Sequence, residues 1–290
     1  MAQAVDKHKL EIALNGFSIP PRPELLIALQ QEIDSGEPDV KYIGKLISQD
    51  IAIAGFLLKV VNSPVFARRQ HIDSAAQACL VLGAEKILLF VRSILIRYQI
   101  GTQKADLFLD TLWDSSNKLA EACVAICQYM QLDFPDEAYT IGMFHNTGMA
   151  ILYSKNADYP KVLTDAYSQE LLTISEYEEV TYSVAHELLS FLVAESWGLS
   201  HEVCNVLAYH HSVNAIYTTG NYIEKEMLSV LKLAEHMLEL GKWLTGYEVD
   251  YEWQRCSDAV LDTLEIELFQ LPDIGEYLEN LGIRNKYSML

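Results

Sequence analysis

Hydrophobic residues recur along most of the chain at spacings of three and four, which is the spacing of one face of an α-helix. With proline and glycine as stops, this pattern predicts helices over 23–34, 40–48, 51–61, 74–82, 84–98, 107–130, 135–145, 158–170, 174–197, 200–210, 224–240 and 253–269. No segment alternates hydrophobic and polar residues for long enough to predict a strand. The sequence therefore predicts an all-α fold.

Two helical lobes are expected on either side of a polar segment at 101–106, which separates two strongly hydrophobic stretches. The expected regions are a polar N-terminal arm, 1–16, an N-terminal helical lobe, 17–100, a second helical lobe, 107–245, and a C-terminal helical extension packed on the second lobe, 246–290. In the first lobe, Asn62 and Ser63 precede Pro64, which disfavours helical geometry before it. They form either a helix stop or the polar lining of a groove between the lobes.

Composition narrows the range of partners. Hydrophobic residues make up 50% of the 290 residues, enough for a substantial core. The formal net charge of −19 repels phosphate backbones and anionic lipids, so neither nucleic acid nor a membrane surface is expected as a partner.

The N-terminal residues lack the hydrophobic core of a signal peptide, and no stretch approaches the roughly 20 apolar residues of a membrane span. The five cysteines lack the spacing of a disulfide framework, so we expect a reducing, cytoplasmic location.

Histidines are concentrated in the second lobe, where six of the eight fall between His145 and His236. A metal site built on helices needs imidazole and carboxylate ligands that project inward from several helices. The candidates for the imidazoles are His145, His186, His210 or His211, and His236. The alternative interpretation of each of these histidines is an ordinary hydrogen-bonded residue of the core or the surface that binds no metal.

The stretch 140–148 is central to any functional interpretation, because His145 is followed by Asn146, an amide where a metal site would place a carboxylate. Asn146, Thr147 and Gly148 also have a structural interpretation, since Asn and Gly tolerate left-handed geometry and suit a helix end or a tight turn.

Several motifs occur in a characteristic order. In the second lobe they are Leu-Trp-Asp-Ser-Ser at 112–116, Gly-Met-Phe-His-Asn-Thr-Gly at 142–148, 179–186, Trp-Gly-Leu at 197–199 and the pair 210–211. In the N-terminal lobe they are Asp50, Asn-Ser-Pro-Val-Phe at 62–66, Ile-Asp-Ser at 72–74, Ala78 and Leu-Gly at 82–83. Together they resemble the HD-related output domain family, HDOD, over about residues 17–240. The resemblance implies a two-lobed, multi-helical HD-like fold with an extra N-terminal helical lobe.

The resemblance also implies descent from phosphohydrolases that bind divalent ions through a His, an adjacent His-Asp pair and a later Asp. Those positions correspond here to Ser115, His145, Asn146 and Glu235. Serine is a poor ligand and asparagine offers a neutral oxygen, whereas catalytic ions in such sites depend on carboxylates. We therefore expect no catalytic residue and no cofactor. Adventitious divalent metal has three weak candidate ligands, His186, His210 and His211.

The family resemblance implies bacterial regulatory proteins that transmit signals through protein contacts. We accordingly expect a non-catalytic signal-transduction module, a pseudo-enzyme with a protein partner; the sequence leaves its oligomeric state open. The alternatives are a metal-dependent phosphohydrolase of nucleotides or cyclic dinucleotides, and a small-ligand sensor that uses the cleft between the lobes. The candidate cleft or partner-binding residues are Asn62, Ser63, His145, His186 and His210.

Overall fold

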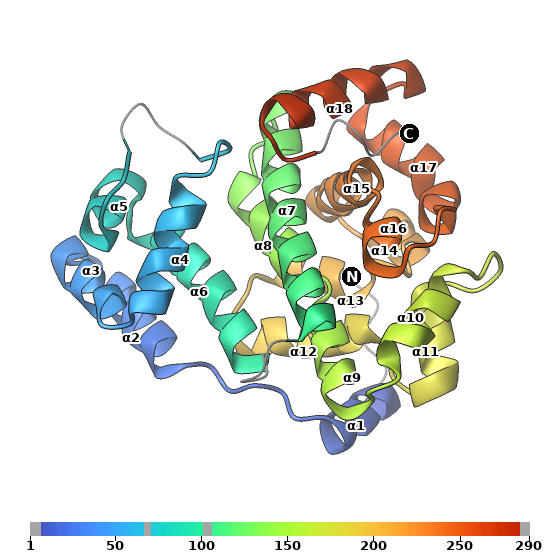
Figure 1. Ribbon diagram of the computed structural model, residues 1–290, viewed down its shortest axis with the longest axis horizontal. Coiled ribbons are helices and arrows are strands. Elements are labelled where there is room, and N and C mark those ends of the chain that lie inside the picture. Colours follow the sequence, from blue (N-terminus) through green and yellow to red (C-terminus); the bar gives the residue numbers. More distant parts are fainter. Residues whose placement is uncertain (1–6, 67–70, 101–105, 285–290) are drawn as a thin grey trace. The chain divides into compact units, whose positions relative to one another are not determined.

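The computed structural model describes residues 7–66, 71–100 and 106–284. Within these ranges every regular element is helical and no strand occurs (Figure 1), which confirms the predicted all-α fold. The boundary expected at 101–106 falls almost entirely outside the described residues. None of the described helices is both long and hydrophobic enough to cross a bilayer.

The chain divides into two compact units. Unit 2 runs from Pro21 to Gln99, and unit 1 contains the described residues up to Pro20 and from Ile100 onward. The helices of unit 2 are α2 (Glu24–Asp34), α3 (Val40–Ser48), α4 (Ile51–Val61), α5 (Ala75–Leu82) and α6 (Ala84–Ile100). The helices of unit 1 are α1 (Lys7–Gly16), α7 (Leu107–Met130), α8 (Pro135–Phe144), α9 (Thr147–Lys155), α10 (Tyr159–Tyr167), α11 (Ile174–Tyr182), α12 (His186–Ser196), α13 (His201–Ala208), α14 (Asn214–Thr219), α15 (Tyr222–Met237), α16 (Leu240–Thr245), α17 (Tyr251–Leu264), the 3₁₀ helix η1 (Leu268–Gln270) and α18 (Leu271–Asn280).

In unit 2, the end of α4 is fixed by the side-chain amide of Asn62. The amide nitrogen donates to the carbonyl oxygens of Leu58 and Ile72, at 2.8 Å each, and the amide oxygen accepts the backbone N–H of Ile72 at 2.9 Å. These bonds tie the helix end to the segment that precedes α5. They favour the helix-stop interpretation of Asn62.

Unit 1 is built around the long helix α7, which packs along α8. The two backbones approach closely because Gly142 faces Ala120, and a Cβ on Gly142 would lie 2.5 Å from the Cα of Ala120. Helix α15 packs on α7, α8, α13 and α17, and α12 packs on α9 and α13. This arrangement gathers the helices that carry the histidines around a single core.

Two predicted helices differ from the structure. The helix expected over 174–197 is broken: α11 ends at Tyr182, the next residue, Ser183, is left-handed with a φ of 60°, and α12 begins at His186. The hydrophobic pattern continues through the break, but the carboxylate of Glu178 accepts the backbone N–H of His186 and stabilises the new helix start. The helix expected over 253–269 ends at Leu264, because Glu265 is left-handed at φ 54°. In addition, the expected polar arm contains helix α1.

Candidate functional site

His145 closes α8, and Asn146 lies between α8 and α9, with both side chains buried. The His145 Nδ1 atom is 2.9 Å from the carbonyl oxygen of Gly142, which can only accept, so Nδ1 carries the proton and Nε2 presents a lone pair. Burial lowers the pKa of His145 to about 3, and the ring is therefore neutral at pH 7. Asn146 has a φ of −99°, so the turn does not use left-handed geometry at this residue.

Gly148 lets α9 and α12 approach each other. A Cβ at this position would collide with the carbonyl oxygen of His186. The N–H of Gly148 donates to Ser190 Oγ at 2.9 Å, and Ser190 donates in turn to the carbonyl oxygen of His145 at 2.7 Å. Gly148 and Ser190 therefore fix His186 relative to His145.

His186 and His210 face each other through their Nε2 atoms, which are 3.1 Å apart. The Nδ1 of His186 donates to Glu178 Oε2 at 2.7 Å, and the Nδ1 of His210 donates to the carbonyl oxygen of Leu207 at 2.9 Å. In the neutral rings both Nε2 atoms therefore carry lone pairs, and two lone pairs do not form a hydrogen bond. In this tautomer the two lone pairs face each other, as they would toward a metal ion bound by both rings.

His211 completes the imidazole cluster. Its Nδ1 donates to Glu252 Oε2 at 2.6 Å, its backbone N–H donates to Glu187, and its Nε2 is buried with no hydrogen-bond partner among the described residues. Ring nitrogens of His186, His210 and His211 lie within 4.8 Å of one another. Burial lowers the pKa of both His210 and His211 well below the usual value, so these two rings are neutral at pH 7.

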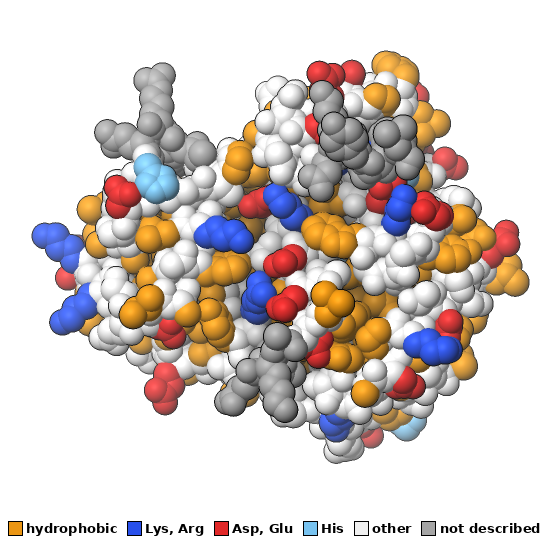
Figure 2. All heavy atoms as spheres, viewed as in Figure 1, with side chains coloured by type: hydrophobic (Ala, Val, Ile, Leu, Met, Phe, Trp, Pro, Cys, Tyr) orange, Lys and Arg blue, Asp and Glu red, His pale blue; other side chains and the backbone are white. Residues whose placement is uncertain are grey.

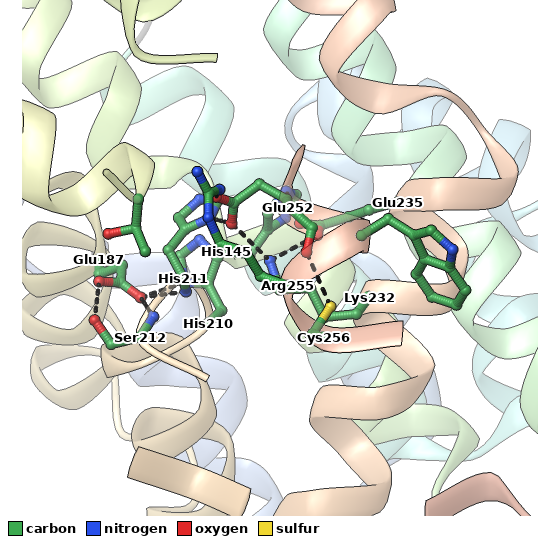
Figure 3. A network of polar contacts seen from close by, with 12 residues as sticks. His145, Glu187, His210, His211, Ser212, Lys232, Glu235, Glu252, Arg255 and Cys256 are labelled. Atoms are coloured by element: carbon green, nitrogen blue, oxygen red, sulfur yellow. Dashed lines mark hydrogen bonds and ion pairs between the residues drawn. The ribbon is translucent and has the colours of Figure 1, made fainter. Parts of the chain in front are cut away.

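Lys232 of α15 brings a positive charge into the same cluster (Figure 3). Its side chain is only 2% exposed, and Nζ lies 2.8 Å from Glu235 Oε2 and 3.9 Å from Glu252 Oε2. Burial opposes the charged form of Lys232, but the two carboxylates outweigh burial and raise its pKa. Glu252 also accepts from Arg255 Nη1 at 2.6 Å, and Glu235 Oε1 is 3.8 Å from His145 Nε2. The lysine is thus protonated and linked to the imidazoles through their carboxylate neighbours.

The structure places most of the candidate residues in this buried cluster of unit 1: His145, Asn146, His186, His210, His211 and Glu235. Ser115 is also buried, but its hydroxyl donates to the carbonyl oxygen of Leu112 in its own helix, at 2.9 Å. His236 lies outside the cluster, paired with Asp250 at 2.9 Å and stacked on Trp253. Asn62 and Ser63 belong to unit 2.

The sequence did not point to the charged partners of the histidines: Glu178, Glu187, Lys232, Glu252 and Arg255. One signal was present, since Lys232 lies on the hydrophobic face of α15 among buried leucines. A lysine there requires a buried acidic partner. Glu252 and Arg255 come from the C-terminal extension, where no motif marks them.

A pocket of about 790 Å³ in unit 1 opens beside the cluster. His211 is among its lining residues, together with Thr173, Ser212, Asn214 and Arg255. The pocket thus gives one face of the imidazole cluster a route to a small molecule.

The donor set fits a two-ion phosphohydrolase centre only in part. The Ser115 hydroxyl is bonded within its own helix, Asn146 is neutral, and Glu235 already binds Lys232. Hard divalent ions in catalytic sites depend on several free carboxylates, whereas these positions offer one neutral amide oxygen and one carboxylate that is already paired, so they fit such ions poorly. The imidazoles of His186, His210 and His211 fit a single nitrogen-ligated ion such as Zn²⁺.

Comparison with known proteins agrees with the fold and the motifs. The chain is 24% identical over 238 residues to an uncharacterised protein of Treponema pallidum, a match that covers 79% of this chain and 44% of that protein. It is 30% identical over 125 residues to a cyclic di-GMP phosphodiesterase of Vibrio cholerae, covering 42% of this chain and 28% of that protein. The chain thus spans less than half the length of either curated relative.

Structural similarity extends over nearly the whole chain. An HDOD domain protein of unknown function from Geobacter sulfurreducens superposes with a TM-score of 0.70 at 19% identity, covering 96% of both chains. The HDOD domain profile matches residues 19–213 of the sequence. Because that match covers more than half of the chain, this protein belongs to the HDOD family.

Proposed function

We propose that this chain is a non-catalytic regulatory module of bacterial signal transduction that acts through contacts with a partner protein. The observation that carries the proposal is the composition of the centre around His145. The residue next to His145, Asn146, is an amide and carries no charge. The carboxylate of Glu235 lies 3.8 Å from Nε2 of His145, but it is bound to Lys232.

Metal-dependent hydrolysis of a phosphate ester needs an ion that activates water, and carboxylates hold such an ion and balance its charge. Asn146 contributes no charge, and the ammonium of Lys232 repels a divalent ion at Glu235. His145 is neutral and 0% exposed, so it is a poor general acid at pH 7. The neutral amide of Asn146 and the ammonium of Lys232 both oppose hydrolysis at this position.

A protein partner is supported by the charge of the chain. With a net charge of −19, the chain is attracted to a basic protein surface and repelled by phosphate backbones. On the face shown in Figure 2, Asp and Glu side chains lie among hydrophobic ones, and Lys and Arg side chains are scattered between them. A cytoplasmic location belongs to the same proposal.

The proposal is tested by phosphodiesterase assays on the full chain, with Mn²⁺ or Mg²⁺ and with cyclic di-GMP or a chromogenic phosphodiester as substrate. Wild-type protein and Asn146→Asp are both expected to release no more product than heat-denatured protein. The new Asp restores one carboxylate but neither supplies a ligand at Ser115 nor displaces Lys232. Turnover that His145→Ala abolishes would instead establish the phosphohydrolase alternative, which the similarity to a cyclic di-GMP phosphodiesterase of Vibrio cholerae makes worth testing.

The partner itself is sought by crosslinking in native cells and mass spectrometry, with binding then measured between purified proteins. Binding is expected to weaken as salt rises, because the attraction between a basic surface and this acidic chain is screened. Affinity that does not change with salt would contradict the electrostatic part of the proposal.

A small-ligand sensor is the second candidate, because His211 of the imidazole cluster lines the pocket together with polar residues such as Thr173, Ser212 and Asn214. This lining suits a ligand with hydrogen-bonding groups. At 100 times its dissociation constant, such a ligand stabilises the protein by about 2.7 kcal/mol. A thermal-shift screen of nucleotides and metabolites, repeated with His211→Phe, distinguishes this function from the first.

A further inference from the structure

Lys232 lies where the carboxylates of the cluster converge (Figure 3). Its Nζ is 2.8 Å from Glu235 Oε2 and 3.9 Å from Glu252 Oε2. Behind each carboxylate is an imidazole: Glu252 Oε2 accepts the Nδ1 proton of His211 at 2.6 Å, and Glu235 Oε1 is 3.8 Å from His145 Nε2. In metal sites a ligating imidazole donates its other N–H to a carboxylate, and carboxylate oxygens also serve as ligands of divalent ions.

The charges of the cluster depend on this lysine. Arg255 bonds to Glu252 and gives its remaining hydrogen bonds to backbone oxygens of residues 169, 170 and 172. The ion-pair contacts of Glu235 among the described residues are Lys232 and His145, and His145 is neutral at pH 7. Without Lys232, the carboxylate of Glu235, whose side chain is 12% exposed, would lose its hydrogen-bonded cation, and since burial already raises the pKa of this carboxyl, the loss is destabilising.

We propose that Lys232 is the resident cation of this centre: its ammonium takes the place of a metal ion at Glu235 and Glu252 and closes that half of the cluster to metal. The fold of unit 1 then holds at any metal concentration. The proposal deepens the proposed function and rests on it. Its readouts are metal content and thermal stability, so it can fail while the absence of hydrolysis stands.

The test compares Lys232→Met, which keeps the length of the side chain and removes the charge, with Lys232→Ala, which also leaves room for an ion. Lys225→Met and Lys225→Ala are the matched controls, because Lys225 is a half-buried lysine of the same helix. Stability is followed by thermal unfolding of the full chain with chelator, Mn²⁺ or Zn²⁺. Retained metal is measured by elemental analysis after dialysis.

Lys232→Met is expected to lower the Tm by about 10 °C, since an unpaired buried charge costs several kcal/mol, and Lys225→Met is expected to change it little. Lys232→Ala is expected to regain much of its lost Tm with Mn²⁺ or Zn²⁺ and to retain one additional equivalent of metal. Adding Glu235→Gln to Lys232→Ala should remove both effects. The metal content of the wild-type protein after dialysis should be the same as that of Glu235→Gln.

Three results would overturn the proposal: wild-type metal that depends on Glu235, equal stability of Lys232→Met and Lys225→Met, or a Lys232→Ala variant that gains neither Tm nor metal. If Lys232→Met alone does not fold, the double variant Lys232→Met/Glu235→Gln removes one charge of each sign. Recovery of folding in the double variant supports the pairing, and failure to recover contradicts it.

Discussion

His145 should make unit 1 sensitive to acid, because its ring is buried in the neutral form. Its pKa is about 3 in the folded chain against about 6.5 in an unfolded one. The unfolded state therefore binds the proton more readily, and stability is lost as the pH falls from about 6.5 toward 3. At pH 5 the ring lies about 1.5 pH units below its unfolded pKa, and at about 1.36 kcal/mol per unit the loss is about 2 kcal/mol.

Other buried groups change stability over the same range. The lowered pKa values of His210 and His211 act in the same direction as that of His145. The carboxyls of Glu187 and Glu252 act in the opposite direction, because burial raises their pKa and the folded chain takes up protons there first. The contribution of His145 is therefore isolated as a difference between wild-type protein and His145→Gln.

The assay is urea unfolding at pH 7 and pH 5, followed by tryptophan fluorescence. All four tryptophans lie in unit 1, so the signal reports this unit: Trp113, Trp197, Trp243 and Trp253. From pH 7 to pH 5, the unfolding free energy of the wild type is expected to fall by about 2 kcal/mol more than that of His145→Gln. The exposed His201→Gln should follow the wild type. Parallel pH profiles for wild type and His145→Gln would refute the reasoning.

Two further substitutions test the packing on which the site depends. Gly148→Ala is expected to cost about 3 kcal/mol or more in urea unfolding, because the new Cβ meets the carbonyl oxygen of His186. Gly55→Ala, where a Cβ meets nothing within 4 Å, should instead stabilise its helix, and equal effects at the two glycines would contradict the close approach of α9 and α12. Asn62→Ala is expected to destabilise unit 2 by about 2 kcal/mol, because the backbone N–H and carbonyl of Ile72 lose the hydrogen bonds that they make with the Asn62 amide. Hydrogen exchange of the Ile72 amide measures this loss, and unchanged protection would show that Asn62 does not hold the helix end.

Much of the fold could be predicted because helical periodicity is a local property. The pattern located α3, α4 and α7 to within a few residues. It did not reveal the break at Ser183, since hydrophobic residues continue on both sides and the stabilising carboxylate of Glu178 is eight residues from His186. Local patterns cannot show a contact of this kind.

The candidate site was predicted in the same partial way. The sequence named His145, His186 and His210 as candidates, each in a motif of its own, and the structure brings the three rings into one cluster. The groups that accept the imidazole protons are backbone carbonyls or carboxylates. Tertiary packing brings the carboxylates into place: Glu252, which accepts the Nδ1 proton of His211, is 41 residues from it in sequence. The chemistry of the cluster therefore emerged only from the three-dimensional structure.

The buried contacts of Lys232 with Glu235 and Glu252 also constrain how this sequence can evolve. A chain that loses the lysine first buries an unpaired carboxylate, and a chain that loses Glu235 first weakens the pairing of a buried ammonium. Either single step is costly in stability, whereas a joint change to neutral residues is not. Among related sequences, the residues at positions 232 and 235 should consequently change together, so that an alignment shows correlated substitutions at these two positions.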